Sequence, residues 1–151
     1  MAKTLLECKD LKKHYPIISG LFSHQIGLRQ VINGISFELK EGDSVGLAGE
    51  SGCGKTVLLR LLMRIERPTE GQVYYEGRDL TSFSKAELMR FRREVQMIFQ
   101  DPVGSLHPRM TIGMTLTEPL TIHRMGSKTE RIARAETILE EVGLEKDMRF
   151  R

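Results

Sequence analysis

Residues 49–56 read Gly-Glu-Ser-Gly-Cys-Gly-Lys-Thr, and this stretch decides the fold. It matches the pattern G-x-x-x-x-G-K-[ST], which connects a strand to a helix and cradles phosphate groups. The flanking sequence fits that position. An apolar run, residues 43–48, comes before it, and a helical pattern with Val57, Leu58 and Leu61 comes after it. The pattern therefore predicts a strand, a phosphate-binding loop and a helix in this order.

Each residue type in the loop has a chemical reason. Glycines let the backbone curl so that successive N–H groups point inward as an anion nest, and the helix presents its positive end to the same phosphates. Lys55 would reach the β and γ phosphates, and the Thr56 hydroxyl would bind Mg²⁺. The alternative is a glycine-rich turn that binds nothing. The predicted nucleotide-binding residues are Gly49, Glu50, Ser51, Gly52, Cys53, Gly54, Lys55, Thr56 and Val57.

Length and composition set the broad class. A chain of 151 residues can bury one core, and 40% hydrophobic with 28% charged residues is ordinary for a globular protein. The net charge, 23 − 20 = +3, does not by itself indicate a nucleic-acid or a membrane partner. The N-terminus lacks the apolar core of a signal peptide, and the longest apolar stretch is too short to span a bilayer. Two cysteines fit a reducing compartment.

Hydrophobic periodicity and turn residues predict the remaining elements. The expected strands cover residues 4–11, 30–39, 43–48, 71–75 and 95–99, with a long loop over 16–27. The expected helices cover 54–67, 84–94, 112–123 and a segment from Ser127 that Gly143 closes. Capping boxes at Ser84 and Ser127 open two of them, and Pro119 disturbs the third.

Two further segments resemble the ATP-binding-cassette (ABC) ATPases. Gln100, followed by Asp-Pro after an apolar segment, resembles their Q-loop, and Tyr15 resembles the A-loop aromatic that stacks on adenine. Residues 96–110, an insertion at 20–22 and Glu-Pro-Leu at 118–120 are closely similar to the oligopeptide and dipeptide importer branch. The resemblance covers essentially the whole chain.

This resemblance implies a fold and a site. The fold would be an α/β P-loop NTPase of ABC-ATPase type, truncated, with N-terminal antiparallel strands, part of the parallel core sheet and the start of the helical subdomain. Residues 1–110 would form the ATP-binding core and 111–151 the start of that subdomain. Lys55 and Gln100 would be the catalytic residues, Thr56 and Gln100 would hold Mg²⁺, and Tyr15 would stack on the base of ATP.

The resemblance also implies partners. Such subunits lie at the cytoplasmic face of the membrane and hydrolyse MgATP to drive import. They bind permease subunits and a second ATPase subunit, and a solute-binding protein completes the system; no nucleic acid is expected. Residues 101–109 and the helix after them would form the surface that docks on the permease.

Parts that hydrolysis requires in this family are not present in the sequence. No Leu-Ser-Gly-Gly-Gln-type signature, Walker B acidic pair or switch histidine follows, and Glu140 and Glu141 fall within an amphipathic helix. We therefore expect an N-terminal portion that binds nucleotide at most, without efficient turnover. The alternatives are a cassette that acts on nucleic acid, a small phosphotransferase, or an inert truncated product.

Overall fold

The computed structural model describes residues 2–19, 24–101 and 104–151, and the chain divides into two compact units, Met1–Val95 and Gln96–Arg151. The insertion at 20–22 and residues 102–103 of the expected docking loop lie outside the described residues. Each unit is described by itself.

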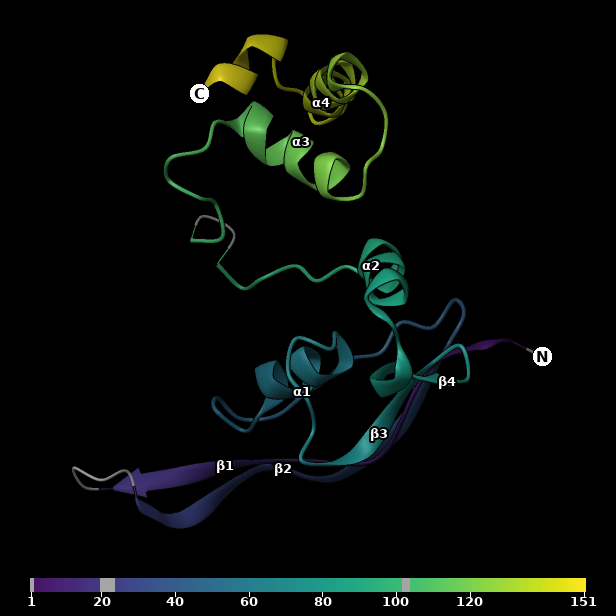
Figure 1. Ribbon diagram of the computed structural model, residues 1–151, viewed down its shortest axis with the longest axis vertical. Helices are drawn as coiled ribbons and strands as arrows, with labels where there is room; N and C mark the ends of the chain where they lie inside the picture. Colours follow the sequence, from purple (N-terminus) through teal and green to yellow (C-terminus); the bar gives the residue numbers. More distant parts are fainter. Residues whose placement is uncertain (1, 20–23, 102–103) are drawn as a thin grey trace. The chain divides into compact units, whose positions relative to one another are not determined.

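The first unit is built on an antiparallel sheet with the order β2-β1-β3-β4 (Figure 1). Its strands are β1 (Thr4–Ser19), β2 (His24–Lys40), β3 (Glu70–Tyr75) and β4 (Arg78–Asp79). The expected loop over 16–27 is wrong at both ends, because Pro16 pairs with Leu28 and Ile18 pairs with Gln25. Local turn residues suggested a loop there, but pairing across the hairpin supplies the hydrogen bonds that extend both strands.

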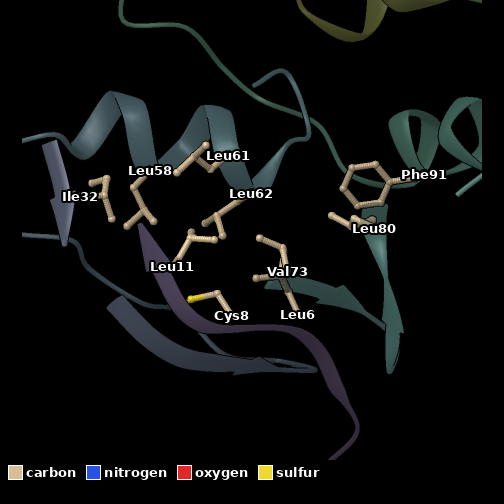
Figure 2. Close-up of a cluster of buried hydrophobic side chains, with 10 residues drawn as sticks. All are labelled: Leu6, Cys8, Leu11, Ile32, Leu58, Leu61, Leu62, Val73, Leu80 and Phe91. Atoms are coloured by element: carbon tan, nitrogen blue, oxygen red, sulfur yellow. The ribbon is translucent and has the colours of Figure 1, made fainter. Parts of the chain in front are cut away.

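Helix α1 (Lys55–Leu62) covers one face of this sheet (Figure 1). Its buried leucines meet side chains from three strands in the core shown in Figure 2. The cluster comprises Leu6, Cys8, Leu11, Ile32, Leu58, Leu61, Leu62, Val73, Leu80 and Phe91. This core fixes α1, and hence the loop before it, against β1 and β2. Helix α1 is shorter than the expected 54–67, because Arg64 has φ 53° and cannot continue a right-handed helix.

Helix α2 (Lys85–Glu94) confirms the predicted capping box. The Ser84 hydroxyl accepts from the Glu87 amide, and the Glu87 carboxylate accepts from the Ser84 amide at 2.8 Å. The inward side chain Phe91 is 1% exposed and packs edge-on against Tyr75, with ring centroids 5.0 Å apart. A short 3-10 helix, η1 (Leu80–Ser82), connects β4 to α2.

The second unit is helical, with α3 (Ile112–Ile122), α4 (Lys128–Glu141) and the 3-10 helix η2 (Lys146–Phe150). The capping box at Ser127 is confirmed, and Gly143 follows α4 with φ 79°, as expected of a terminating glycine. Ala135 and Leu139 are buried on one face of α4, but Val142 is 66% exposed because the helix has ended there.

Two expected strands are wrong. Residues 43–50 and 96–99 have no strand structure, although both segments are apolar. Val45 is 64% exposed and Ile98 is 93% exposed. A strand exists only when a neighbour supplies its hydrogen bonds, and the described residues pair only in antiparallel fashion among β1 to β4. The apolar pattern predicted buried strands, but in the structure these segments are largely exposed.

Candidate functional site

The loop at 49–56 closes around its own lysine. The Lys55 ammonium donates to the Gly49 carbonyl at 2.6 Å and to the Glu50 carbonyl at 2.7 Å, and lies 3.7 Å from Cys53 Sγ. The two carbonyls are neutral. Within the described residues, no carboxylate forms an ion pair with Lys55. The site therefore has an unneutralised positive charge. The three N–H donors of the ammonium thus meet the Gly49 carbonyl, the Glu50 carbonyl and the Cys53 sulfur.

The start of α1 adds to this positive potential. Its N-cap is Gly54, no side chain caps it, and no acidic residue lies in its first turn. The first intrahelical bond runs from the Leu58 amide to the Gly54 carbonyl at 2.9 Å. Helix geometry leaves the amides before Leu58 without intrahelical acceptors, and the macrodipole places partial positive charge there. This arrangement of N–H donors and positive charge could hold an anion of several oxygens.

Gly54 is the glycine that the geometry requires. It is buried with φ 105°, and a Cβ would lie 2.9 Å from the Val31 carbonyl and 3.0 Å from Ile32 Cδ1. The loop is therefore seated directly on β2. Gly52 also has positive φ, at 80°, but no atom lies within 4 Å of a Cβ placed there. Its role is conformational, because few L-residues adopt that backbone.

The other predicted loop residues lie at the surface, as a site open to a ligand requires. Glu50, Ser51, Cys53 and Thr56 are exposed, and Val57 turns inward to pack on the core. The Thr56 hydroxyl lies in the first turn of α1, next to Lys55. A hydroxyl in this position, together with phosphate oxygens and water, fits the oxygen ligands that Mg²⁺ takes. Groups of three or more His, Cys, Asp or Glu residues suited to a metal are absent from the described part of the chain.

Tyr15 belongs to the same unit and lies on β1, half-buried, opposite Arg29 of β2. Its hydroxyl donates to the Glu66 carboxylate at 2.6 Å, and the Lys13 ammonium lies 5.0 Å from the ring centroid. Burial and the Glu66 carboxylate raise the pKa of the tyrosine, while the hydrogen bond from Tyr15 lowers the pKa of Glu66. Sequence reasoning missed Glu66, because the two residues are 51 positions apart and no local pattern connects them.

Gln100 belongs to the second unit, whereas the phosphate loop belongs to the first. Its side chain is exposed. The Asp101 carboxylate accepts from the Gly104 amide at 2.9 Å, and the Asp101 carbonyl accepts from the Ser105 hydroxyl at 2.6 Å. The role of Gln100 at Mg²⁺ remains a prediction.

The second unit also shows what Glu140 and Glu141 do. Both are exposed on α4, and they form ion pairs with Lys146 and Arg134, each at 3.2 Å. They are surface residues, as the helical pattern predicted. Within the described residues, no helix combines the length and hydropathy needed to cross a bilayer.

The sheet, the helix seated on it and the phosphate loop between them define an α/β P-loop nucleotide-binding fold. Comparison with known proteins makes this specific: the family model described as ABC transporter matches residues 32–151. The chain therefore belongs to the ABC transporter family. The ATP-binding cassette MJ0796 bound to ADP and Pi has a similar structure, with a TM-score of 0.77 and 26% identity, over 96% of this chain and 60% of that one.

Curated relatives are similar over nearly the whole chain. The oligopeptide transport ATP-binding protein AppF of Bacillus subtilis is 43% identical over 94% of this chain and 44% of its own length. The dipeptide transport ATP-binding protein DppF of Escherichia coli is 42% identical over 95% of this chain and 43% of its own length. The chain thus spans less than half the length of these relatives, and it corresponds to their N-terminal part.

Proposed function

We propose that this chain is the ATP-binding portion of an ATPase that energises import of peptides or related small solutes. MgATP binds with its triphosphate in the loop at 49–56. The observation that carries this proposal is the Lys55 ammonium. It lies in the loop without a carboxylate partner among the described residues, next to an α1 start that no side chain caps.

Each residue has a defined task in this proposal. The Lys55 ammonium and the amides at the start of α1 bind the β and γ phosphates. Thr56 would hold Mg²⁺ through its hydroxyl, and Gln100 would supply its amide to Mg²⁺ and the attacking water. Bound Mg²⁺ would neutralise charge on the phosphate oxygens. Tyr15 supplies an aromatic face to the base. In other proteins, stacking of one base on an aromatic side chain contributes roughly 1–3 kcal/mol to binding.

The likeness to peptide-transport relatives supports the partners that we propose. These are permease subunits in the cytoplasmic membrane, a second ATPase subunit and a solute-binding protein. Residues 101–109 and α3 would dock on the permease from the cytoplasmic side. The exposed apolar segments 43–48 and 96–99 support the view that further strands complete the sheet in the whole ATPase.

Hydrolysis is a separate question from binding. The carboxylate that orients the attacking water in the family is not among the residues of this chain, and Glu140 and Glu141 are engaged with cations on the surface of α4. A held and polarised γ-phosphate without that group reacts slowly. We therefore propose nucleotide binding without efficient turnover for this chain alone, with turnover reserved for the whole ATPase.

The test is MgATP binding by calorimetry on the wild type and on Lys55→Ala. The expected loss is roughly ten- to a hundredfold in affinity, the worth of a charge-assisted hydrogen bond. Lys85→Ala is the matched control, because Lys85 is the first residue of capped helix α2, as Lys55 is of α1. Equal binding by wild type and Lys55→Ala would contradict the site. Nucleic acid that is retained and then released steeply by salt would instead favour the nucleic-acid alternative.

A further inference from the structure

Glu66 joins the base-binding strand to the helix of the phosphate loop. Its carboxylate accepts from the Tyr15 hydroxyl at 2.6 Å and lies 3.6 Å from the Lys13 ammonium and 3.5 Å from the Arg60 guanidinium. Lys13 and Tyr15 lie on β1, and Arg60 lies in the last turn of α1. One carboxylate therefore contacts both elements that the proposed nucleotide would use.

Backbone bonds hold Glu66 in this position. The amides of Ile65 and Glu66 both donate to the Arg60 carbonyl, at 2.9 and 3.2 Å, which fixes the chain as it leaves α1. Further along, the Thr69 amide donates to the Lys12 carbonyl at 2.9 Å, and the Lys13 ammonium donates to the Arg67 carbonyl at 2.8 Å. The segment after α1 is thus tied to β1 at Lys12 and Lys13, just before Tyr15.

The Glu66 cluster differs from the other ion pairs of this sheet. Lys12 pairs with Glu70 at 2.8 Å, but the Glu70 side chain is 56% exposed and contacts no aromatic hydroxyl. The Glu66 side chain is 24% exposed, and its shortest contact is the neutral Tyr15 hydroxyl rather than either cation. Exposed pairs of the Lys12–Glu70 kind contribute little to stability. A carboxylate whose closest partner is a tyrosine hydroxyl orients that ring.

We propose that Glu66 is a positioning residue for base recognition: it fixes the Tyr15 ring so that one face is presented to the nucleotide base. This proposal rests on the proposed function, because it requires a nucleotide in the phosphate loop. Lys13 lies over the ring, so the base stacks on the face opposite Lys13. A ring that is already ordered loses less conformational freedom when it binds, so pre-organisation increases affinity for the base alone.

The experiment separates the base from the phosphates. Affinities for MgATP and for magnesium tripolyphosphate, which has no base, are measured on the same protein, and their ratio reports base recognition. Lys55→Ala is expected to lower both affinities and leave the ratio unchanged. Tyr15→Ala is expected to lower the MgATP affinity alone. If wild type binds neither ligand, the proposed function fails, whatever Glu66 does.

Glu66→Ala is the decisive variant. We expect the ratio to fall roughly two- to tenfold, the cost of ordering one side chain on binding, with tripolyphosphate affinity unchanged. Tyr15→Phe keeps the ring but lacks the hydroxyl, so it is expected to lower the ratio equally. Adding Glu66→Ala to it should produce no further loss. Glu70→Ala is the matched control, because it removes a carboxylate that pairs with β1 without touching Tyr15.

A ratio that stays at the wild-type value in Tyr15→Phe and Glu66→Ala would overturn the inference while leaving phosphate binding intact. An unchanged ratio in Tyr15→Ala would overturn it as well, because the ring would then not contact the base. If Glu66→Ala does not fold, Tyr15→Phe carries the test by itself. Glu66→Gln keeps an acceptor oxygen for the hydroxyl and is expected to retain most of the ratio.

Discussion

Helix α1 and helix α4 begin in opposite ways. At α4 the Ser127 hydroxyl and the Glu130 carboxylate satisfy the exposed amides, with the Ser127 amide donating to Glu130 at 2.6 Å. At α1 the N-cap is a glycine with no side-chain acceptor. The α4 start uses its donors within the protein, so it stabilises the helix. The α1 start has no side-chain acceptor for its donors, so its stability must come from packing on the sheet.

The largest expected effect comes from adding one methyl group at the α1 start. Gly54→Ala combines a left-handed backbone, φ 105°, with a Cβ only 2.9 Å from the Val31 carbonyl. We expect a loss of about 2–3 kcal/mol in the free energy of unfolding, since strain and a backbone clash add, together with loss of MgATP binding. Urea denaturation and calorimetry measure the two effects.

Gly143→Ala, after α4, is the control for this prediction. Gly143 has φ 79°, but no atom lies within 4 Å of an added Cβ. It is expected to cost only the backbone term, about 1–2 kcal/mol, and to leave nucleotide binding unchanged. Equal losses for the two variants would show that Gly54 is not seated against β2.

The next prediction compares one substitution at each helix start: the one at α4 is expected to change stability, and the one at α1 is expected to change binding. Ser127→Ala removes a side-chain cap and should lower the free energy of unfolding by about 1 kcal/mol, with no change in MgATP affinity. Thr56→Ala removes an exposed hydroxyl from the uncapped start, so stability should change by less than about 0.5 kcal/mol while Mg²⁺-dependent ATP affinity falls. If Thr56→Ala destabilised the protein as much as Ser127→Ala does, the contrast between the two starts would be wrong.

The smallest effect is a pH dependence at the start of α2. The Ser84 amide, followed by Arg78 and the Ser84 hydroxyl, lowers the pKa of Glu87 from 4.5 to about 2. A depressed pKa means that the stabilisation is complete above about pH 4.5 and disappears as the pH falls through about 2. The urea midpoint of wild type should therefore approach that of Glu87→Gln over this interval.

Parallel midpoint curves for wild type and Glu87→Gln across that interval would contradict the capping-box contribution. The same experiment on Glu130, whose pKa is also lowered by the Ser127 amide, tests the second capping box. No comparable carboxylate titrates at the α1 start, because its first turn has no acidic residue. The pH dependence of helix capping is thus expected from α2 and α4.

Local patterns in the sequence predicted what depends on near neighbours. The capping boxes at Ser84 and Ser127 and the helices after them were correct, because cap, amide and carboxylate lie within one turn. The order of phosphate loop and helix was correct for the same reason. The segments 43–48 and 95–99 were wrong because strand structure depends on hydrogen-bond partners that are distant in sequence, and apolar composition does not show whether those partners are present.

The sequence by itself determined the glycine-rich loop before α1, the capped helices and the family, because each is encoded in short spacings of residue types. Only the tertiary structure decided the length of the β1–β2 hairpin, the contact of Gly54 with β2 and the joining of Tyr15 to Glu66. These depend on atoms brought together by packing across tens of residues. No spacing in the chain shows which side chains will meet, since the core shared by α1 and the sheet sets their distances.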